Sequence, residues 1–200
     1  EPSSPRGEQG GGDRPGRGFK SPVLKTTPRR DQGFLLDSVD PKIRNVSGTA
    51  GAAEFKKLWE PQSAASPVWN EVTKLLFLGS VSVMRNGKTR ELCAPYVYYQ
   101  WPRALAGEAS GAIIAKEALL KAKPATTAVT LGTLSYDLVA VADGEVADDN
   151  KESAQKWVKL KAGSREGYVP EEHVRSPLEY RACFANIGTR WRMTSLEVGE

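Results

Sequence analysis

The sequence is poor in the residues that build metal sites and nucleophilic sites. Its 200 residues include one histidine, His173, and two cysteines, Cys93 and Cys183. A zinc site takes three or four ligands at close spacing, and these residues do not provide them. A Cys–His nucleophile pair also needs a third group that orients the histidine. We therefore expect no catalytic residues, no metal and no cofactor. A hydrolase that uses two of the 24 acidic residues is the enzymatic alternative, but no pair is singled out by its setting.

Long apolar runs are also missing. Runs such as Leu75–Leu78 fall far short of the roughly 20 residues that a membrane-spanning helix needs. We therefore expect no transmembrane segment. The chain starts at Glu1 with no signal peptide, as a mature secreted or periplasmic protein does. A lipid anchor would require an N-terminal cysteine that was removed.

The net charge of +4 is concentrated in the first 33 residues, where seven Arg and Lys face four acidic residues. The remainder is close to neutral and offers no basic patch, so we expect no nucleic-acid partner. Residues 1–33 also contain seven Gly and five Pro. Such a segment buries too little apolar surface to offset the entropy of ordering it, which predicts a disordered basic tail. Weak attraction of this tail to anionic lipid or cell-wall polymers is the alternative to simple solvation.

The two cysteines leave two alternatives open. In an oxidising compartment Cys93 and Cys183 could form a disulfide, and closing a loop of about 90 residues would stabilise the fold by roughly 4–5 kcal/mol in the chain-entropy model. Otherwise both are small buried hydrophobic side chains, because free cysteine is among the most buried residue types.

Residues 34–109 predict an accessory region with two short helices and a hairpin. The pattern of residues Ala52–Trp59 favours a first helix that ends at Glu60-Pro61. A second helix is expected to begin at Ser66-Pro67, with the serine as N-cap, and to stop at Gly79. Asn86-Gly87 is the strongest short signal for a hairpin turn between two strands.

From Gly111 onward the pattern changes to short strands separated by polar, glycine or proline breaks, which is typical of a small barrel or sandwich. The acidic stretch 143–150 predicts a solvated loop, and Gly188 marks a final hairpin. The expected strands are Ile113–Leu120, Val129–Leu134, Leu138–Val141, Trp157–Leu160, Gly167–Val169, Tyr180–Phe184 and Arg190–Leu196.

Several of these segments resemble the signature of bacterial SH3-like (SH3b) domains. The segments are Lys123–Pro124, Leu134–Asp137, Trp157–Leu160 and Gly167–Val169, followed by the closing pair Tyr180–Phe184 and Trp191–Thr194. The resemblance implies a small SH3-like β-barrel over residues 110–200. The expected fold class is then mainly β with a small helical accessory region, an α+β arrangement.

The resemblance also implies a secreted or periplasmic bacterial protein that binds peptides in an aromatic-lined groove. The candidate ligand-binding residues are Tyr136, Trp157, Tyr168, Tyr98, Tyr99 and Trp101. Aromatic side chains on short strands more often belong to the core, which is the alternative for Trp157 and Tyr168. Residues 98–101 either attach the accessory region to the barrel or line a cleft between them.

The sequence thus favours a non-catalytic binding protein of the bacterial envelope. Its expected partner is a peptidoglycan peptide or another periplasmic protein. The alternative is an inhibitor, an immunity-type protein or an assembly partner that covers a surface of one periplasmic protein. Fold alone does not decide between them.

Overall fold

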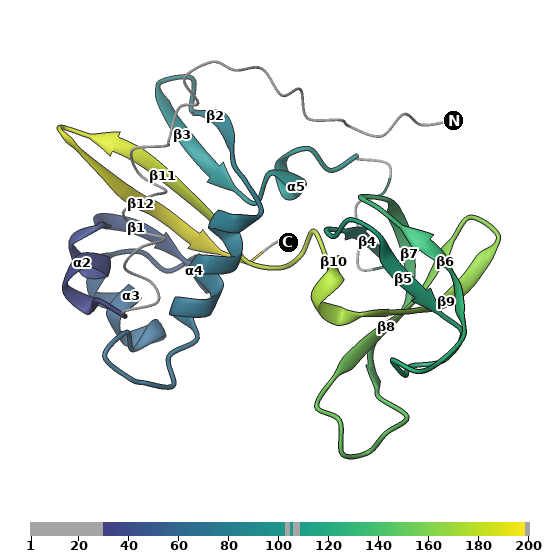
Figure 1. The fold of residues 1–200 in the computed structure, drawn as a ribbon. Helices are drawn as coiled ribbons and strands as arrows, with labels where there is room; N and C mark the ends of the chain where they lie inside the picture. The colour runs from purple at the N-terminus through teal and green to yellow at the C-terminus, as the bar shows by residue number, and fades with distance from the viewer. Residues whose placement is uncertain (1–29, 103–104, 106–108, 199–200) are drawn as a thin grey trace. The chain divides into compact units, whose positions relative to one another are not determined.

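The computed structural model describes residues 30–102, 105 and 109–198. Contacts within the chain divide these residues into two compact units (Figure 1). The outer unit holds residues 30–100 together with 180–198, and the inserted unit holds residues 101–179. The chain therefore leaves the outer unit, builds a second unit and returns. Most of the predicted disordered tail, residues 1–29, lies outside the described residues.

The outer unit is built on a five-stranded sheet with the order β1-β12-β11-β3-β2. β1 and β12 run parallel, and the other neighbours are antiparallel. The two strands nearest the end of the chain, β11 and β12, therefore lie in the interior of this sheet. The strands span Val39–Asn45 (β1), Val81–Arg85 (β2), Thr89–Ala94 (β3), Arg181–Ile187 (β11) and Arg190–Glu197 (β12).

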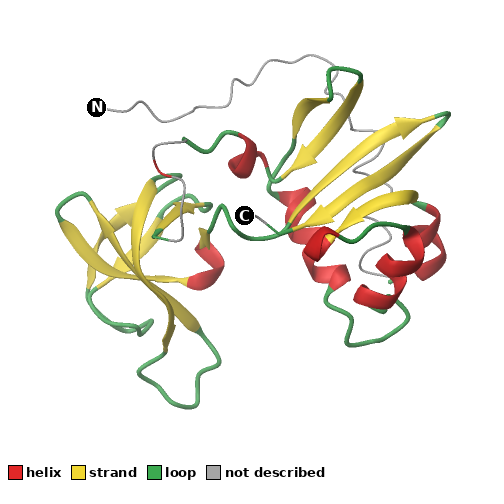
Figure 2. Ribbon diagram, turned by 180° about the vertical axis from the view of Figure 1, so that it is seen from behind, coloured by secondary structure: helices red, strands yellow, loops and turns green. Residues whose placement is uncertain are grey.

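Helices pack against one face of this sheet (Figure 2). They are α2 (Gln32–Asp37), α3 (Ala52–Trp59) and α4 (Val68–Phe77), and the single turn α5 (Tyr96–Tyr99) follows β3. α4 buries Val68, Val72 and Leu75 at the spacing of one helix face, against a core that includes Phe184 and Met193. None of the helices in the described part of the chain is long and apolar enough to cross a membrane.

Most local signals for these elements are confirmed. α3 spans the predicted residues. The predicted N-cap Ser66 is wrong, because α4 begins at Val68 with Pro67 as its N-cap and without a hydrogen bond from a capping side chain. The β2–β3 hairpin turns at Asn86 and Gly87, whose φ angles are 50° and 65°. Two consecutive residues with positive φ are the requirement of the tight hairpin turn that an Asn-Gly pair favours.

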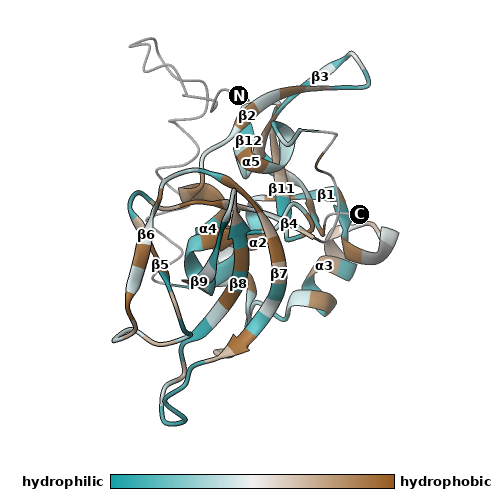
Figure 3. Cartoon of the chain, turned by 90° about the vertical axis from the view of Figure 1, so that its right-hand side faces the viewer, coloured by the Kyte–Doolittle hydropathy of each residue, from teal (hydrophilic) through white to brown (hydrophobic). Residues whose placement is uncertain are grey.

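The inserted unit is a seven-stranded sheet with the order β10-β4-β7-β8-β9-β5-β6. Its core joins buried side chains such as Leu120, Leu134, Val158 and Leu160. Hydrophilic and hydrophobic residues follow one another along β8 (Figure 3), and its buried residues are Trp157, Val158 and Leu160. The strands span Ser110–Ile113 (β4), Ala118–Lys121 (β5), Thr130–Leu134 (β6), Leu138–Ala147 (β7), Lys156–Ala162 (β8), Arg165–Pro170 (β9) and Val174–Arg175 (β10).

The predicted C-terminal SH3-like β-barrel over residues 110–200 is wrong. The strands of this stretch go to two different sheets, because β11 pairs with β3 and β12 pairs with β1 in the outer unit. The other strands form a sheet whose described ends, β6 and β10, do not pair with each other, so no closed barrel results. The chain is mainly β with two sheets, and its helices pack beside one of them.

Two strand assignments also change. The predicted strand Ile113–Leu120 is two strands, β4 and β5, separated by a turn in which Glu117 has a φ of 58°. The acidic stretch that begins at Asp143, predicted to be a loop, continues β7 as far as Ala147 with most of its side chains exposed. The backbone of this stretch pairs with β8, and the composition of the stretch alone does not predict this pairing.

Candidate functional site

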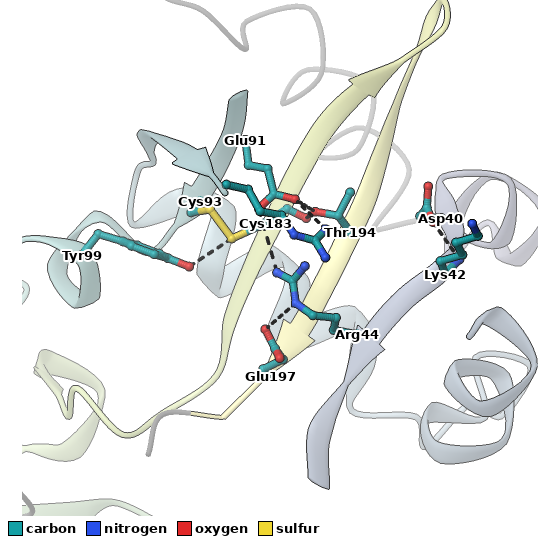
Figure 4. A network of polar contacts seen from close by, with 10 residues as sticks. Asp40, Lys42, Arg44, Glu91, Cys93, Tyr99, Cys183, Thr194 and Glu197 are labelled. Atoms are coloured by element: carbon teal, nitrogen blue, oxygen red, sulfur yellow. Dashed lines mark hydrogen bonds and ion pairs between the residues drawn. A yellow bond between two sulfur atoms is a disulfide. The ribbon is translucent and has the colours of Figure 1, made fainter. Parts of the chain in front are cut away.

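A group of charged and polar side chains gathers on the face of the outer sheet that lies away from the helices. Successive side chains of a strand point to opposite faces. Ala182 and Phe184 join the core beneath the helices, so Arg181 and Cys183 point to the other side. β3 behaves alike, since Ala94 joins that core while Glu91 and Cys93 lie on the polar face. Figure 4 shows Glu91, Cys93 and Cys183 of this group.

Glu91 is the centre of this polar group and is only 3% exposed. Thr194 donates its hydroxyl to Oε1 of Glu91 at 2.7 Å. Two arginines approach the same carboxylate, with Nη1 of Arg85 at 3.5 Å and Nη2 of Arg44 at 3.9 Å. Arg44 also places Nε 3.5 Å from Glu197. A buried carboxylate needs such partners, because removing an unpaired charge from water is costly.

The cysteines lie next to this network and form a disulfide. Cys93 and Cys183 are directly opposite in the antiparallel β3–β11 pair, with their Cα atoms 4.1 Å apart. Both residues are buried. Of the two alternatives that the sequence left open, the structure has the bonded pair.

Tyr99 and Tyr98 connect α5 to this face. The hydroxyl of Tyr99 lies 3.0 Å from Sγ of Cys183. Burial raises the pKa of the Tyr99 phenol to about 12, although the positive charge of Arg181 acts in the opposite direction. The guanidinium of Arg181 stacks over the ring of Tyr98, with Cζ 4.5 Å from the ring centroid. Tyr98 in turn packs edge-on against Tyr99.

This arrangement does not suit metal binding. Ligand atoms of Glu91, Cys93 and Cys183 lie within 4.8 Å of one another. The two sulfur atoms are bonded to each other, however, and a metal needs thiolates. The carboxylate is already occupied by Arg44, Arg85 and Thr194.

The six predicted ligand-binding residues are divided between the two units. Tyr98 and Tyr99 belong to the outer unit, in contact with the polar face just described. Trp101, Tyr136, Trp157 and Tyr168 belong to the inserted unit.

Within the inserted unit, Trp157 and Trp101 have internal partners. Trp157 on β8 is 1% exposed and donates its indole N–H to Oδ2 of Asp148 at 2.8 Å. This hydrogen bond is the main cause that lowers the pKa of the Asp148 carboxyl. Trp101 donates its indole N–H to the carbonyl of Leu105 at 2.9 Å. Tyr168 on β9 is half-buried.

Tyr136 is the predicted residue that the structure leaves most accessible, at 54% exposure. It lies in the turn between β6 and β7 with a φ of 57°. Asp137 accepts the backbone N–H of Ser135 at 2.8 Å, and Ser135 accepts the backbone N–H of Glu117 at the same distance. These bonds fix the turn and keep the tyrosine ring at the surface. Other exposed apolar residues on neighbouring segments are Leu119, Val129, Leu131 and Leu138.

The charged residues of the polar face were not predicted from the sequence. Glu91 lies in the segment Thr89–Ala94. Only the apolar residues that follow Glu91 indicate that this part of the strand is buried. Its partners Arg44 and Thr194 are distant in the chain, so no local pattern connects them. Alternation along a strand places Glu91 on the same face as Cys93, and that was the available signal.

No family model and no curated protein matches the chain. Among solved structures, a variant of a protein named Rd1NTF2_05 matches at 11% sequence identity, over 92% of this chain and 95% of that chain, with a TM-score of 0.28. A TM-score this low carries no argument about fold or function.

Proposed function

We propose that the chain is a non-catalytic binding protein of the bacterial envelope that recognises an extended peptide segment of the cell wall or of a protein partner. The observation that carries this proposal is the free edge of β6 in the inserted unit. β6 (Thr130–Leu134) is the last strand in its sheet and pairs with β5 alone among the described strands. Its other edge offers backbone donors and acceptors to an added strand.

The composition of β6 supports this role. Natural proteins protect sheet edges with charge, proline or very short strands. The edge strand β1 contains Pro41, Lys42 and Arg44, and the edge strand β10 has two residues. β6 reads Thr-Leu-Gly-Thr-Leu and has neither a charge nor a proline. An unprotected edge strand promotes aggregation unless a binding partner covers it.

Exposed apolar side chains accompany this edge. Leu131 on β6 is 43% exposed, and Val129 immediately before the strand is 72% exposed. Leu119 on β5 and Tyr136 in the turn after β6 are 44% and 54% exposed. Backbone pairing would supply affinity for an extended peptide, and these side chains would supply selectivity. Grouped exposed apolar residues commonly mark interaction surfaces.

The proposed compartment is supported by the disulfide. Cys93 and Cys183 form a buried bond in the outer unit. Such bonds persist in oxidising compartments, including the bacterial periplasm and the cell exterior, and are rare in the cytosol.

The test is sedimentation of the full chain with purified peptidoglycan sacculi, together with a pull-down from an envelope extract. Leu131→Lys places a charge on the β6 edge and should abolish capture in both formats. Phe77→Lys changes a residue of the outer unit that is 74% exposed and should leave capture intact.

Sedimentation with sacculi that Leu131→Lys abolishes identifies a cell-wall peptide as the ligand. A single stoichiometric protein that Leu131→Lys loses would identify a protein partner and would favour the inhibitor or assembly role. Capture that is unchanged in Leu131→Lys, or no capture at all, overturns binding at this edge.

A further inference from the structure

We infer that the polar face of the outer unit binds a small carboxylate through the guanidinium groups of Arg44 and Arg181. This inference is independent of the proposed peptide edge, because the two sites lie in different units. It rests on unpaired donors, on the balance of charge and on the way in which the two arginines are held.

Both arginines have donors without acceptors. Nη1 of Arg44 and Nη1 of Arg181 are buried, and neither meets a hydrogen-bond acceptor among the residues that the structure describes. A buried donor that stays unpaired destabilises a protein, so an acceptor that reaches it gains binding energy. A carboxylate is suited to this task, because its two oxygens match the planar fork of a guanidinium.

The two arginines lie close to one shared residue, Glu197. Arg44 places Nε 3.5 Å from Oε2 of Glu197. Arg181 lies directly opposite Glu197 in the β11–β12 pair. The two arginines therefore come from β1 and β11, the strands on either side of β12, which carries Glu197.

The charges of the polar face do not cancel. Arg44, Arg85 and Arg181 contribute three positive charges, whereas Glu91 and Glu197 contribute two negative ones. These five side chains leave one net positive charge on a partly exposed surface, where Arg44 is 31% and Arg85 43% exposed. A ligand with a single negative charge neutralises it. Tyr99 adds no competing negative charge, because burial raises the pKa of its phenol to about 12.

Both guanidinium groups are held before a ligand arrives. Arg44 is anchored at two of its nitrogens by Glu197 and Glu91. Arg181 is stacked on the ring of Tyr98. An arginine fixed in this way loses little conformational entropy on binding. The side chain of Arg44 is 31% exposed, so part of it is accessible to a ligand.

The experiment is an NMR titration of the full chain with two matched probes. One probe is N-acetyl-alanyl-alanine with a free C-terminal carboxylate, and the other is the same peptide with a C-terminal amide. The carboxylate form should bind at least about tenfold more tightly than the amide, as expected for loss of a charge-assisted hydrogen bond. The shifted backbone amides should lie in β11 and β12, whereas binding at the peptide edge would shift those of β6.

Three variants test which arginine causes the preference for the carboxylate probe. Arg181→Gln should remove the preference for the carboxylate, and Arg181→Lys should keep part of it because it retains the charge without the fork. Arg190→Gln is the control, because it removes one exposed arginine from the far end of the same hairpin. Thermal unfolding of each variant confirms that it is folded.

The inference is overturned if acid and amide bind equally or neither binds. It is also overturned if Arg181→Gln and Arg190→Gln give the same affinities. Inorganic phosphate is the competing anion in a final titration. If phosphate displaces the acid probe at a lower concentration than the probe's own dissociation constant, the site belongs to phosphate and the assignment to carboxylates fails.

Discussion

The hydroxyl of Thr194 on β12 reaches Glu91 on β3 across the intervening strand β11. A break in the β11–β12 register leaves Thr194 without an opposite residue, between Met193 and Ser195. Such a bulge turns a side chain away from the ordinary alternation. The residue on β11 directly opposite Glu91 is the small Ala185, which leaves room for the contact. The sheet is thus shaped around a buried carboxylate.

Glu91→Gln should lower the free energy of unfolding by about 1.5–3 kcal/mol, because the amide still accepts from Thr194 but lacks the negative charge that Arg44 and Arg85 face. The loss should be smaller than for a fully buried pair, since Arg44 and Arg85 remain partly exposed. Chemical denaturation measures it. The control, Glu54→Gln, breaks a surface pair with Lys57 and should change stability by less than about 0.5 kcal/mol. Equal effects of the two variants would contradict the structural role of Glu91.

Trp157→Ala should destabilise the inserted unit by about 3–5 kcal/mol, because it leaves a large cavity in place of a buried indole. Tyr136→Ala, which changes an exposed aromatic residue of the same unit, should cost far less. Guanidinium denaturation followed by circular dichroism compares the two variants. A denaturation midpoint that Trp157→Ala leaves unchanged would mean that the indole is not part of the core.

Asp148 should make the inserted unit sensitive to acid. The hydrogen bond from Trp157 lowers the pKa of Asp148 in the folded state. The folded state therefore holds the proton less tightly than the unfolded state, whose aspartate pKa is about 3.9. The stabilisation is complete above that pH and is lost as pH falls through the lower folded value. Melting temperatures from pH 6 to pH 2.5 should show this loss in the wild type but not in Asp148→Asn. Parallel profiles for both proteins would exclude this role.

Tyr99 should make the outer unit sensitive to alkali. Its folded pKa of about 12 lies above the ordinary tyrosine value of 10.0. The folded state therefore binds the proton more tightly than the unfolded state. This contribution is complete below about pH 10 and is lost as pH rises toward 12. Denaturation midpoints between pH 8 and pH 11.5 should fall more steeply for the wild type than for Tyr99→Phe. A variant with the same slope as the wild type would argue against a buried phenol.

Removal of the disulfide should act on the outer unit alone. Cys93 and Cys183 are 90 positions apart. The chain-entropy model gives about 4–5 kcal/mol for such a loop. A folded inserted unit shortens the effective loop, so we expect the double variant Cys93→Ala, Cys183→Ala to lose about 3–4 kcal/mol. Thermal unfolding should then separate into two transitions, with the inserted unit unchanged. A shift of both transitions together would mean that the units unfold as one.

Local features were predictable because they depend on a few neighbouring residues. The spacing of Val68, Val72 and Leu75 indicates a helix face, and Asn86-Gly87 indicates a hairpin turn. Both are present. The position of the final hairpin was also predictable, with its turn at Gly188, whose φ is 69°.

Long-range pairing could not be predicted from the same patterns. The final hairpin has the composition of a strand pair in either sheet, and its pairing with β1 and β3 is decided by packing against helices encoded more than 100 residues earlier. The segments that precede the hairpin resemble SH3b domains, and this resemblance wrongly placed the hairpin in one sheet with them. Glu91 was missed for a related reason, since Arg44, one of its two arginine partners, and its hydroxyl partner Thr194 come from β1 and β12.

The position of the disulfide has a mechanical consequence. Cys93 lies one residue before the end of β3, and Cys183 lies two residues after the start of β11, so the covalent bond closes a ring that contains the whole inserted unit. Tension applied between residues 30 and 198 would pass from one cysteine to the other through the sulfur atoms. The inserted unit would therefore feel no pulling force, and a cut in one of its loops would leave both fragments joined.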